Sequence, residues 1–135
     1  MAASPTPRQR GRPEADIQRQ IVALLRAVLP KTAIVHHVAN EVGSGGAHGR
    51  IRQAILTGMG VHAGFSDLLV LSDGRALSLE VKSASGRLSP AQADFRDAIQ
   101  AQGFAWALVR SPKEALDTLK AYGFRTRLVE PRGSG

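Results

Sequence analysis

The first strong pattern in the chain is a run of apolar positions spaced three or four residues apart. Between residues 14 and 29 these positions are Ile17, Ile21, Leu24, Leu25, Val28 and Leu29. The spacing predicts an amphipathic helix, which Pro30 ends. Glu14 lies seven residues before Ile21, so we expect its carboxylate on the buried stripe of the helix. Alternatively, Glu14 only places a negative charge at the positive end of the helix, as Asp16 could.

The rest of the chain alternates short strand-like runs with further helical segments. Asp73-Gly74 separates two such runs and is a strong signal for a two-residue hairpin turn. Ser89 before Pro90 is typical of a helix start, and Gly123 of a helix end. The predicted strands cover residues 33–38, 68–71, 76–82 and 104–109, the predicted helices cover 50–56, 90–102 and 112–122, and residues 43–49 form a loop. This order predicts an α/β fold in which helices flank a mixed sheet.

The predicted hairpin places two carboxylates opposite each other. If Asp73 and Gly74 are the two turn residues, Asp67 faces Glu80 on the same side of the sheet, with Cβ atoms about 4.5–5.5 Å apart. Two negative charges at that separation repel. A divalent cation such as Mg²⁺ or Mn²⁺ reverses the sign, because hard cations bind carboxylate oxygens. A loop of odd length would remove this register and leave Glu80 on an ordinary solvated face.

Two more polar residues are predicted to lie beside this pair. Lys82 shares a strand face with Glu80, about 6.5–7 Å along the chain. Gln92 lies three residues before Phe95 and seven before Ile99, which puts it on the inward stripe of its helix. A buried amide needs hydrogen-bond partners, which a carboxylate or a water can provide. Alternatively, Gln92 is an ordinary polar residue of a first helical turn.

The charge balance and the absence of cysteine narrow the range of possible functions further. The 135 residues carry 18 basic and 11 acidic side chains, a formal net charge of +7, and 14 of the basic residues are Arg. Such a balance favours nucleic acid or an anionic membrane as partner. The absence of Cys rules out disulfides, a thiolate zinc site and a thiol nucleophile. The chain has no apolar run typical of a membrane span or a secretory signal, so we expect a soluble, intracellular protein.

Two other patterns give little support for a site. His36 and His37 are neighbours on a predicted strand and point to opposite faces, so they cannot chelate one ion together. With His48 and His62, they have no Cys to complete a zinc set. The glycine-rich residues 43–49 lack the Gly-Lys-Ser/Thr ending of a phosphate-binding loop. A mobile surface loop is the expectation there, with DNA contact as the alternative.

Taken together, several segments of the chain match one nuclease family. The chain resembles the VRR-NUC (virus-type replication–repair nuclease) branch of the PD-(D/E)XK nucleases from about Glu14 to Arg110. The matching segments are Glu14, Asn40-Glu41, Gly64-Phe-Ser-Asp67-Leu, Leu79-Glu-Val-Lys82 and Gly86-Arg-Leu-Ser-Pro-Ala-Gln92. Ser66 stands where many members carry Pro. The resemblance implies a restriction-endonuclease-like α-β-α core, which agrees with the predicted order of elements.

The activity implied by this resemblance is metal-dependent hydrolysis of DNA phosphodiester bonds. Mg²⁺ or Mn²⁺ would be bound by Asp67 and Glu80, with help from Glu14 and the backbone carbonyl of Val81. Lys82 would orient or activate the attacking water and stabilise charge on the phosphate. Gln92 would position Lys82 or the water. The predicted catalytic residues are therefore Glu14, Asp67, Glu80, Lys82 and Gln92.

The implied partner is DNA. Standalone members of this size are similar to homodimeric phage enzymes that cut branched DNA such as four-way (Holliday) junctions, so we expect a homodimer in the cytoplasm of a bacterial or phage-infected cell. A chain this short leaves little for a recognition domain, which favours reading DNA shape. The alternatives are a restriction-type, sequence-specific endonuclease and a basic DNA-binding module without catalysis. The predicted DNA contacts are Asn40, Arg50, Arg52, Ser66, Arg87 and Arg96.

The predicted organisation is one nuclease domain between two tails. Residues 1–13 are rich in Pro, Arg and small polar residues, and are predicted to form a flexible basic tail. Its arginines at positions 8, 10 and 12 add to the candidate phosphate contacts. Residues 14–128 form the predicted VRR-NUC domain, and residues 129–135 a second flexible tail.

Overall fold

The computed structural model describes residues 7–39 and 46–127, and only the backbone of residues 7–12, 46–49, 52 and 53. Helices and strands follow one another in the predicted order, so the predicted α/β class is confirmed. The elements are α1 (Pro7–Val28), β1 (Ile34–His37), α2 (Gly46–Gly58), β2 (Leu68–Ser72), β3 (Arg75–Val81), α3 (Pro90–Ala101), β4 (Ala105–Val109) and α4 (Pro112–Ala121). The second predicted tail lies outside the described residues.

Helix α1 begins earlier than the sequence pattern predicts. It starts at Pro7, so residues 7–13 are helical and the expectation of a flexible tail up to residue 13 is wrong for that stretch. Proline at the start of a helix costs little, because the first N–H groups have no partner within the helix. The Arg and Gln residues that follow are good helix formers. Pro13 is tolerated inside α1 although it removes one backbone hydrogen bond.

The four strands form one mixed sheet in the order β1-β2-β3-β4. Strands β1, β2 and β3 are antiparallel neighbours, and β4 runs parallel to β3 after the crossover through α3. The β2–β3 turn is the predicted two-residue turn, with φ of +52° at Asp73 and +76° at Gly74. Leu71 therefore pairs with Ala76, and Leu69 with Ser78. This register is the one on which the predicted carboxylate pair depends.

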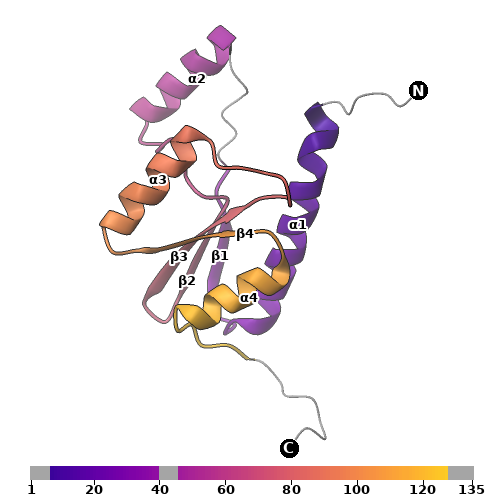
Figure 1. Cartoon of the computed structure of the whole chain (residues 1–135). Helices are drawn as coiled ribbons and strands as arrows, with labels where there is room; N and C mark the ends of the chain where they lie inside the picture. The colour runs from indigo at the N-terminus through magenta and orange to yellow at the C-terminus, as the bar shows by residue number, and fades with distance from the viewer. Residues whose placement is uncertain (1–6, 40–45, 128–135) are drawn as a thin grey trace, which may run out of the picture.

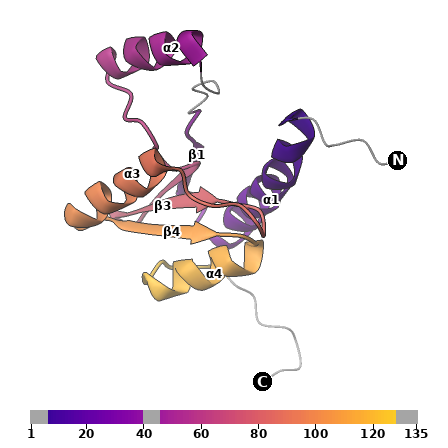
Figure 2. The same ribbon diagram turned by 45° about the horizontal axis from the view of Figure 1, so that its top comes forward.

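The helices cover the two faces of the sheet unequally. Side chains of α1 and α4 form the core with one face, whereas α3 packs on the other; Figures 1 and 2 show α3 and α4 on opposite sides of the sheet. The alternation along β3 decides which side chains go where, because successive residues point to opposite faces. The buried core residues are Ile21, Leu25, Val28, Leu29, Leu68, Val70, Leu77, Leu79, Val81, Val109, Ala115, Leu119 and Phe124.

Helix α2 stands away from the sheet in both views (Figures 1 and 2). It begins at Gly46, so residues 46–49 are helical where a loop was predicted, and the rest of that loop lies outside the described residues. Glycine is tolerated at the N-terminal end of a helix, where it is among the favoured capping residues. Two of its large apolar side chains are exposed, Ile51 at 59% and Ile55 at 58% accessibility. None of the described helices is long and apolar enough to cross a membrane.

Candidate active site

The structure brings Asp67 and Glu80 together across the β2–β3 hairpin. Asp67 directly precedes β2, and Glu80 is the penultimate residue of β3, so the observed register makes them neighbours on one face. The Asp67 carboxylate reaches across and accepts a hydrogen bond of 2.8 Å from the backbone N–H of Val81. This bond fixes one carboxylate oxygen beside the second acid. The carboxylate pair predicted from the turn is therefore present.

Glu80 is a buried acid in a face that also carries polar neighbours. Only 1% of its surface is accessible. Its Oε1 accepts a 3.0 Å hydrogen bond from Nε2 of Gln92, while Oε2 has no donor among the described residues. Burial first, and then the neighbouring carboxylate of Asp67, raise the pKa of Glu80 to about 9. The nearby positive charge of Lys82 acts in the opposite direction.

A buried carboxylate oxygen without a hydrogen-bond partner, beside a second carboxylate, costs free energy unless a proton or a cation binds between the two acids. Without metal, the raised pKa means that Glu80 keeps a proton near neutral pH. With metal, the same two acids offer oxygens of the kind that hard divalent cations prefer. The residues present therefore fit Mg²⁺ or Mn²⁺ better than a softer ion.

Glu14 lies near this pair but does not complete a compact cluster. It is half-buried in α1, and its charge adds to the upward shift of the Glu80 pKa. Within residues 7–39 and 46–127, no three His, Asp or Glu side chains lie close enough together to hold a metal ion. A cation here would take Asp67 and Glu80 as its two side-chain ligands. Water and phosphate oxygens complete such sites in proteins that bind Mg²⁺.

Helix α3 holds Glu80 through its first turn. The Ser89 hydroxyl accepts from the Gln92 backbone N–H at 3.2 Å, and the Gln92 Oε1 accepts from the Ser89 backbone N–H at 2.9 Å. This capping box orients the Gln92 side chain, whose Nε2 then donates to Glu80. Gln92 therefore has both features that the sequence suggested: it belongs to the first turn of α3, where it caps the helix, and it contacts Glu80. Its contact is with Glu80, a carboxylate of the kind that a buried amide was expected to need, and not with Lys82, which the resemblance implied.

The loop before Asp67 packs directly on the same turn of α3. Gly64 has a φ of +76°, and a Cβ added there would lie 2.2 Å from the Ala91 carbonyl oxygen. Only glycine permits this approach. The rings of Phe65 and Phe95 lie 4.4 Å apart and fix the loop further along α3. The loop and the helix start therefore place Asp67 and Gln92 as one unit.

The predicted DNA contacts fall into distinct groups. Ser66 is fully buried, so the expectation that it touches DNA is wrong; it sits directly before the carboxylate pair and points into the protein. Arg50 and Arg87 are exposed and remain candidates. Arg96 is half-buried, 2.9 Å from Asp97 and stacked over Trp106 at 5.9 Å from the ring centre. Asn40 and the side chain of Arg52 lie outside the described residues.

One residue that the sequence analysis set aside does contact the site. His37 Nδ1 lies 2.9 Å from Gln18 Nε2 and 3.2 Å from the backbone oxygen of Asp67. It links α1 to the residue that carries the first carboxylate. No motif marks His37, because this contact joins three separate segments. His62 instead packs its ring against Phe95.

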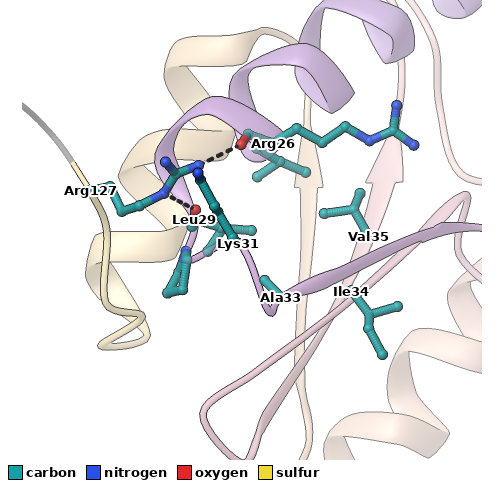
Figure 3. Close-up of a pocket in the computed structure, with 9 residues that line it drawn as sticks. Arg26, Leu29, Lys31, Ala33, Ile34, Val35 and Arg127 are labelled. Carbon is teal, nitrogen blue, oxygen red and sulfur yellow. Dashed lines mark hydrogen bonds between the residues drawn. The ribbon is translucent and has the colours of Figure 1, made fainter.

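A separate cavity lies away from these residues, at the end of α1. It holds about 600 Å³ between the last turn of α1 and the start of β1, and Figure 3 shows Arg26, Lys31 and Arg127 around it. The Arg127 guanidinium donates to the carbonyl oxygens of Leu29 at 2.6 Å and Arg26 at 3.0 Å. Arg127 therefore closes the C-terminal end of α1, where a cation is favourable. None of the predicted catalytic residues lines this cavity.

A mixed sheet flanked by helices, with Asp67 directly before β2 and Lys82 directly after β3, is the arrangement of a PD-(D/E)XK-like fold. Among solved structures, the chain is similar to a "VRR_NUC domain protein" at a TM-score of 0.62 and 18% identity, over 82% of this chain and 87% of that one. It is also similar to a "VRR_NUC domain" at a TM-score of 0.55 and 21% identity, over 83% of this chain and 98% of that one. No family model and no curated protein matches the sequence. The chain has the VRR-NUC fold that the motifs predicted.

Proposed function

We propose that this protein is a metal-dependent DNA endonuclease. The observation that carries the proposal is the buried Glu80, whose Oε2 has no donor, placed beside Asp67 and held by Gln92. A purely structural protein gains nothing from a fully buried acid beside a second, half-buried acid, because an apolar pair would avoid the cost of desolvation. The likeness to VRR_NUC domain structures supports the same activity.

In this mechanism the metal site consists of Asp67 and Glu80, with the Val81 carbonyl and Glu14 as further candidates. Mg²⁺ or Mn²⁺ would supply Lewis-acid stabilisation of the phosphate charge. The Val81 N–H holds the Asp67 carboxylate, and Gln92 holds that of Glu80, so both acids are oriented before metal arrives. Orientation of this kind reduces the reorganisation needed during the reaction.

Lys82 supplies the positive charge at the reacting phosphate. It follows β3 directly and its charge acts on Glu80, so its ammonium group lies beside the acids. Water attacks the phosphorus, a new P–O bond forms, and the bond to the leaving deoxyribose oxygen breaks. Lys82 would hold the water or stabilise the additional negative charge on the phosphate. A protonated lysine cannot itself bind the metal, because an ammonium has only donors.

The proposed substrate is branched DNA, read by shape, and the proposed assembly is a homodimer. The net charge of +7 and the exposed Arg50 and Arg87 support binding to phosphates. The exposed apolar residues Ile51 and Ile55 of α2, with Met59 directly after the helix, support pairing with a second copy. A dimer would present two sites to the two strands of a junction.

The decisive experiment compares labelled duplex, flap and four-way-junction DNA in Mg²⁺, Mn²⁺ and EDTA. We expect metal-dependent cleavage that is fastest on branched DNA, and loss of cleavage in Asp67→Asn and Glu80→Gln. DNA binding should persist or tighten in both variants, because neither change touches the basic phosphate contacts and Asp67→Asn also removes a negative charge near the phosphates. Cleavage of plain duplex at one sequence would indicate a restriction-type enzyme. Binding without cleavage in any metal would contradict the nuclease proposal.

A further inference from the structure

Arg110 is the side chain that holds the turn after Lys82. It directly follows β4, and its guanidinium Nη1 donates to the backbone oxygen of Ser83 and, at 2.9 Å, to that of Gly86. The Ala84 oxygen lies 3.4 Å from the same nitrogen. One planar cation thus gathers the carbonyl oxygens of a turn that lies more than twenty residues earlier in the chain. Arginine suits this role because its donors are rigidly arranged.

The same turn packs against the stem of Lys82. A Cβ added to Gly86 would lie 3.3 Å from both Cβ and Cδ of Lys82, so Gly86 lies beside the aliphatic chain with little room for a side chain between them. The turn is closed by the Gly86 N–H, which donates to the Ser83 oxygen at 3.0 Å. The backbone N–H of Lys82 is bound to the Val109 oxygen at 3.1 Å. Lys82 is therefore held at its backbone by Val109 and along its stem by the turn that Arg110 gathers.

We propose that Arg110 is a positioning residue for Lys82. By binding the carbonyl oxygens of the 83–86 turn, it keeps Gly86 against the lysine stem and restricts the ammonium group to the side of the two acids. Without those donors the carbonyls turn to solvent, the 83–86 turn loosens, and Lys82 samples more rotamers. The functional half of this inference rests on the nuclease function proposed above. The structural half, from Arg110 to Lys82, does not.

Two measurements on the protein without metal or DNA test the structural half. In Arg110→Gln, we expect amide hydrogen exchange of residues 83–88 to rise about tenfold or more, because the turn loses the donors that close it. We also expect faster labelling of the Lys82 amine by an acylating reagent, relative to the exposed Lys113 in the same molecule. Arg125→Gln is the matched control, since it removes one arginine charge at the Asp73 hairpin, remote from this turn. Unchanged exchange and labelling in Arg110→Gln would overturn the proposal.

Single-turnover cleavage at saturating DNA tests the functional half. We expect Arg110→Gln to lower the rate about 10- to 100-fold with little change in KM, as misplacement of a reacting group does. Arg110→Lys should recover part of the rate, since an ammonium can still donate to the turn. A raised KM with an unchanged maximal rate and a shallower salt dependence would instead identify Arg110 as a phosphate contact and overturn the proposal.

A second variant keeps the inference testable if Arg110→Gln does not fold. Gly86→Ala adds a methyl group against the Lys82 stem and leaves Arg110 in place. We expect it to change Lys82 labelling and lower the cleavage rate, whereas full activity and unchanged labelling would contradict the contact on which the inference depends. If the wild-type protein cleaves no DNA, the nuclease proposal fails, and exchange and labelling still decide whether Arg110 positions Lys82.

Discussion

Glu80 is buried near the end of β3, close to Lys82 and to the first turn of α3. Its Oε2 has no hydrogen-bond partner among the described residues. Its pKa is raised to about 9 by burial and then by Asp67, so the protein without metal holds a proton that an exposed glutamate would have lost. The unfolded chain releases this proton near pH 4.5. Between those two values the folded state binds more protons than the unfolded state. The free energy of unfolding therefore falls as the pH rises through this interval.

Replacing Glu80 with Gln removes this titration while keeping the size of the side chain. In EDTA at pH 8, we expect the variant to melt about 3–6 °C above the wild type, the shift that about 1 kcal/mol produces in a domain of this size. Its Tm should also depend less on pH between 5 and 9. In millimolar Mn²⁺ the order should reverse, because only the wild type gains stability from metal binding. Melting curves measured by calorimetry at each pH provide the check.

The control for this experiment is Asp117→Asn, which neutralises an exposed acid of α4 paired with Lys113. Surface pairs of this kind contribute little, so its pH dependence should follow that of the wild type. Equal slopes for Glu80→Gln and the wild type would contradict the buried-acid interpretation.

Substitution of Lys82 distinguishes a nuclease from a DNA-binding module without catalysis. Lys82→Ala should keep the Mn²⁺-induced rise in Tm, because the lysine is not a metal ligand, yet lower the cleavage rate by about 10²-fold or more. Lys82→Arg should restore little activity, because a planar fork replaces a compact charge. Single-turnover kinetics and melting curves measure the two effects, with the exposed Lys113→Ala as control. Full activity in Lys82→Ala would contradict the proposed mechanism.

At the scale of elements, the site depends on how the 59–67 loop meets the start of α3. Gly64 lies against the backbone of Ala91 and Gln92, and Gln92 in turn holds Glu80. The hairpin brings Asp67 to the same place from the other direction. A change in the packing between this loop and α3 therefore moves Asp67 and, through Gln92, also Glu80.

Gly64→Ala tests this coupling against Gly60→Ala. Both glycines have positive φ, of +76° and +101°, but a Cβ at Gly60 meets nothing within 4 Å. Both variants suffer the backbone strain of an alanine in this region, of order 1–3 kcal/mol. Gly64→Ala should lose about 1–3 kcal/mol more, from overpacking against Ala91. Urea unfolding measures both values, and equal losses would show that the loop yields freely at this contact.

At the scale of the whole molecule, the most exposed apolar surface lies on the element that packs least on the others. Helix α2 projects from the body, and the exposed Ile51 and Ile55 on it are followed at the same four-residue interval by Met59, directly after its end. Apolar residues at this spacing form one stripe of a helix. A stripe without a partner in its own chain is typical of a protein–protein contact.

The proposed homodimer predicts that Ile55→Glu lowers the mass in solution. A charge in the centre of the stripe would have to be desolvated in the interface, which opposes association. Sedimentation equilibrium should then find a monomer, while Thr57→Glu, which adds the same charge on another side of α2, should remain dimeric. A wild-type monomer at all micromolar concentrations would contradict the dimer. Equal masses for Ile55→Glu and the wild type would place the interface elsewhere.

The features predicted correctly from sequence depend on residues that are close together in the chain. The Asp73-Gly74 turn determines the β2–β3 register, and the register alone places Asp67 beside Glu80. Likewise, Ser89 and Gln92 form a capping box from within four residues. Turn chemistry and helix caps are local, so no knowledge of packing is needed to predict them.

Only the tertiary structure decided which side chains those local units meet. Ser66 was predicted to contact DNA from its place directly before Asp67, yet it is fully buried, so it cannot do so. Glu14 shares the helical direction of Ile21, yet its distance from Asp67 and Glu80 depends on how α1 crosses the sheet. The contact of Arg110 with the turn after Lys82 joins residues 24 and 27 positions apart. Contacts of this range are determined by the packing of β3, β4 and α3 together, and no periodicity within a single segment carries that information.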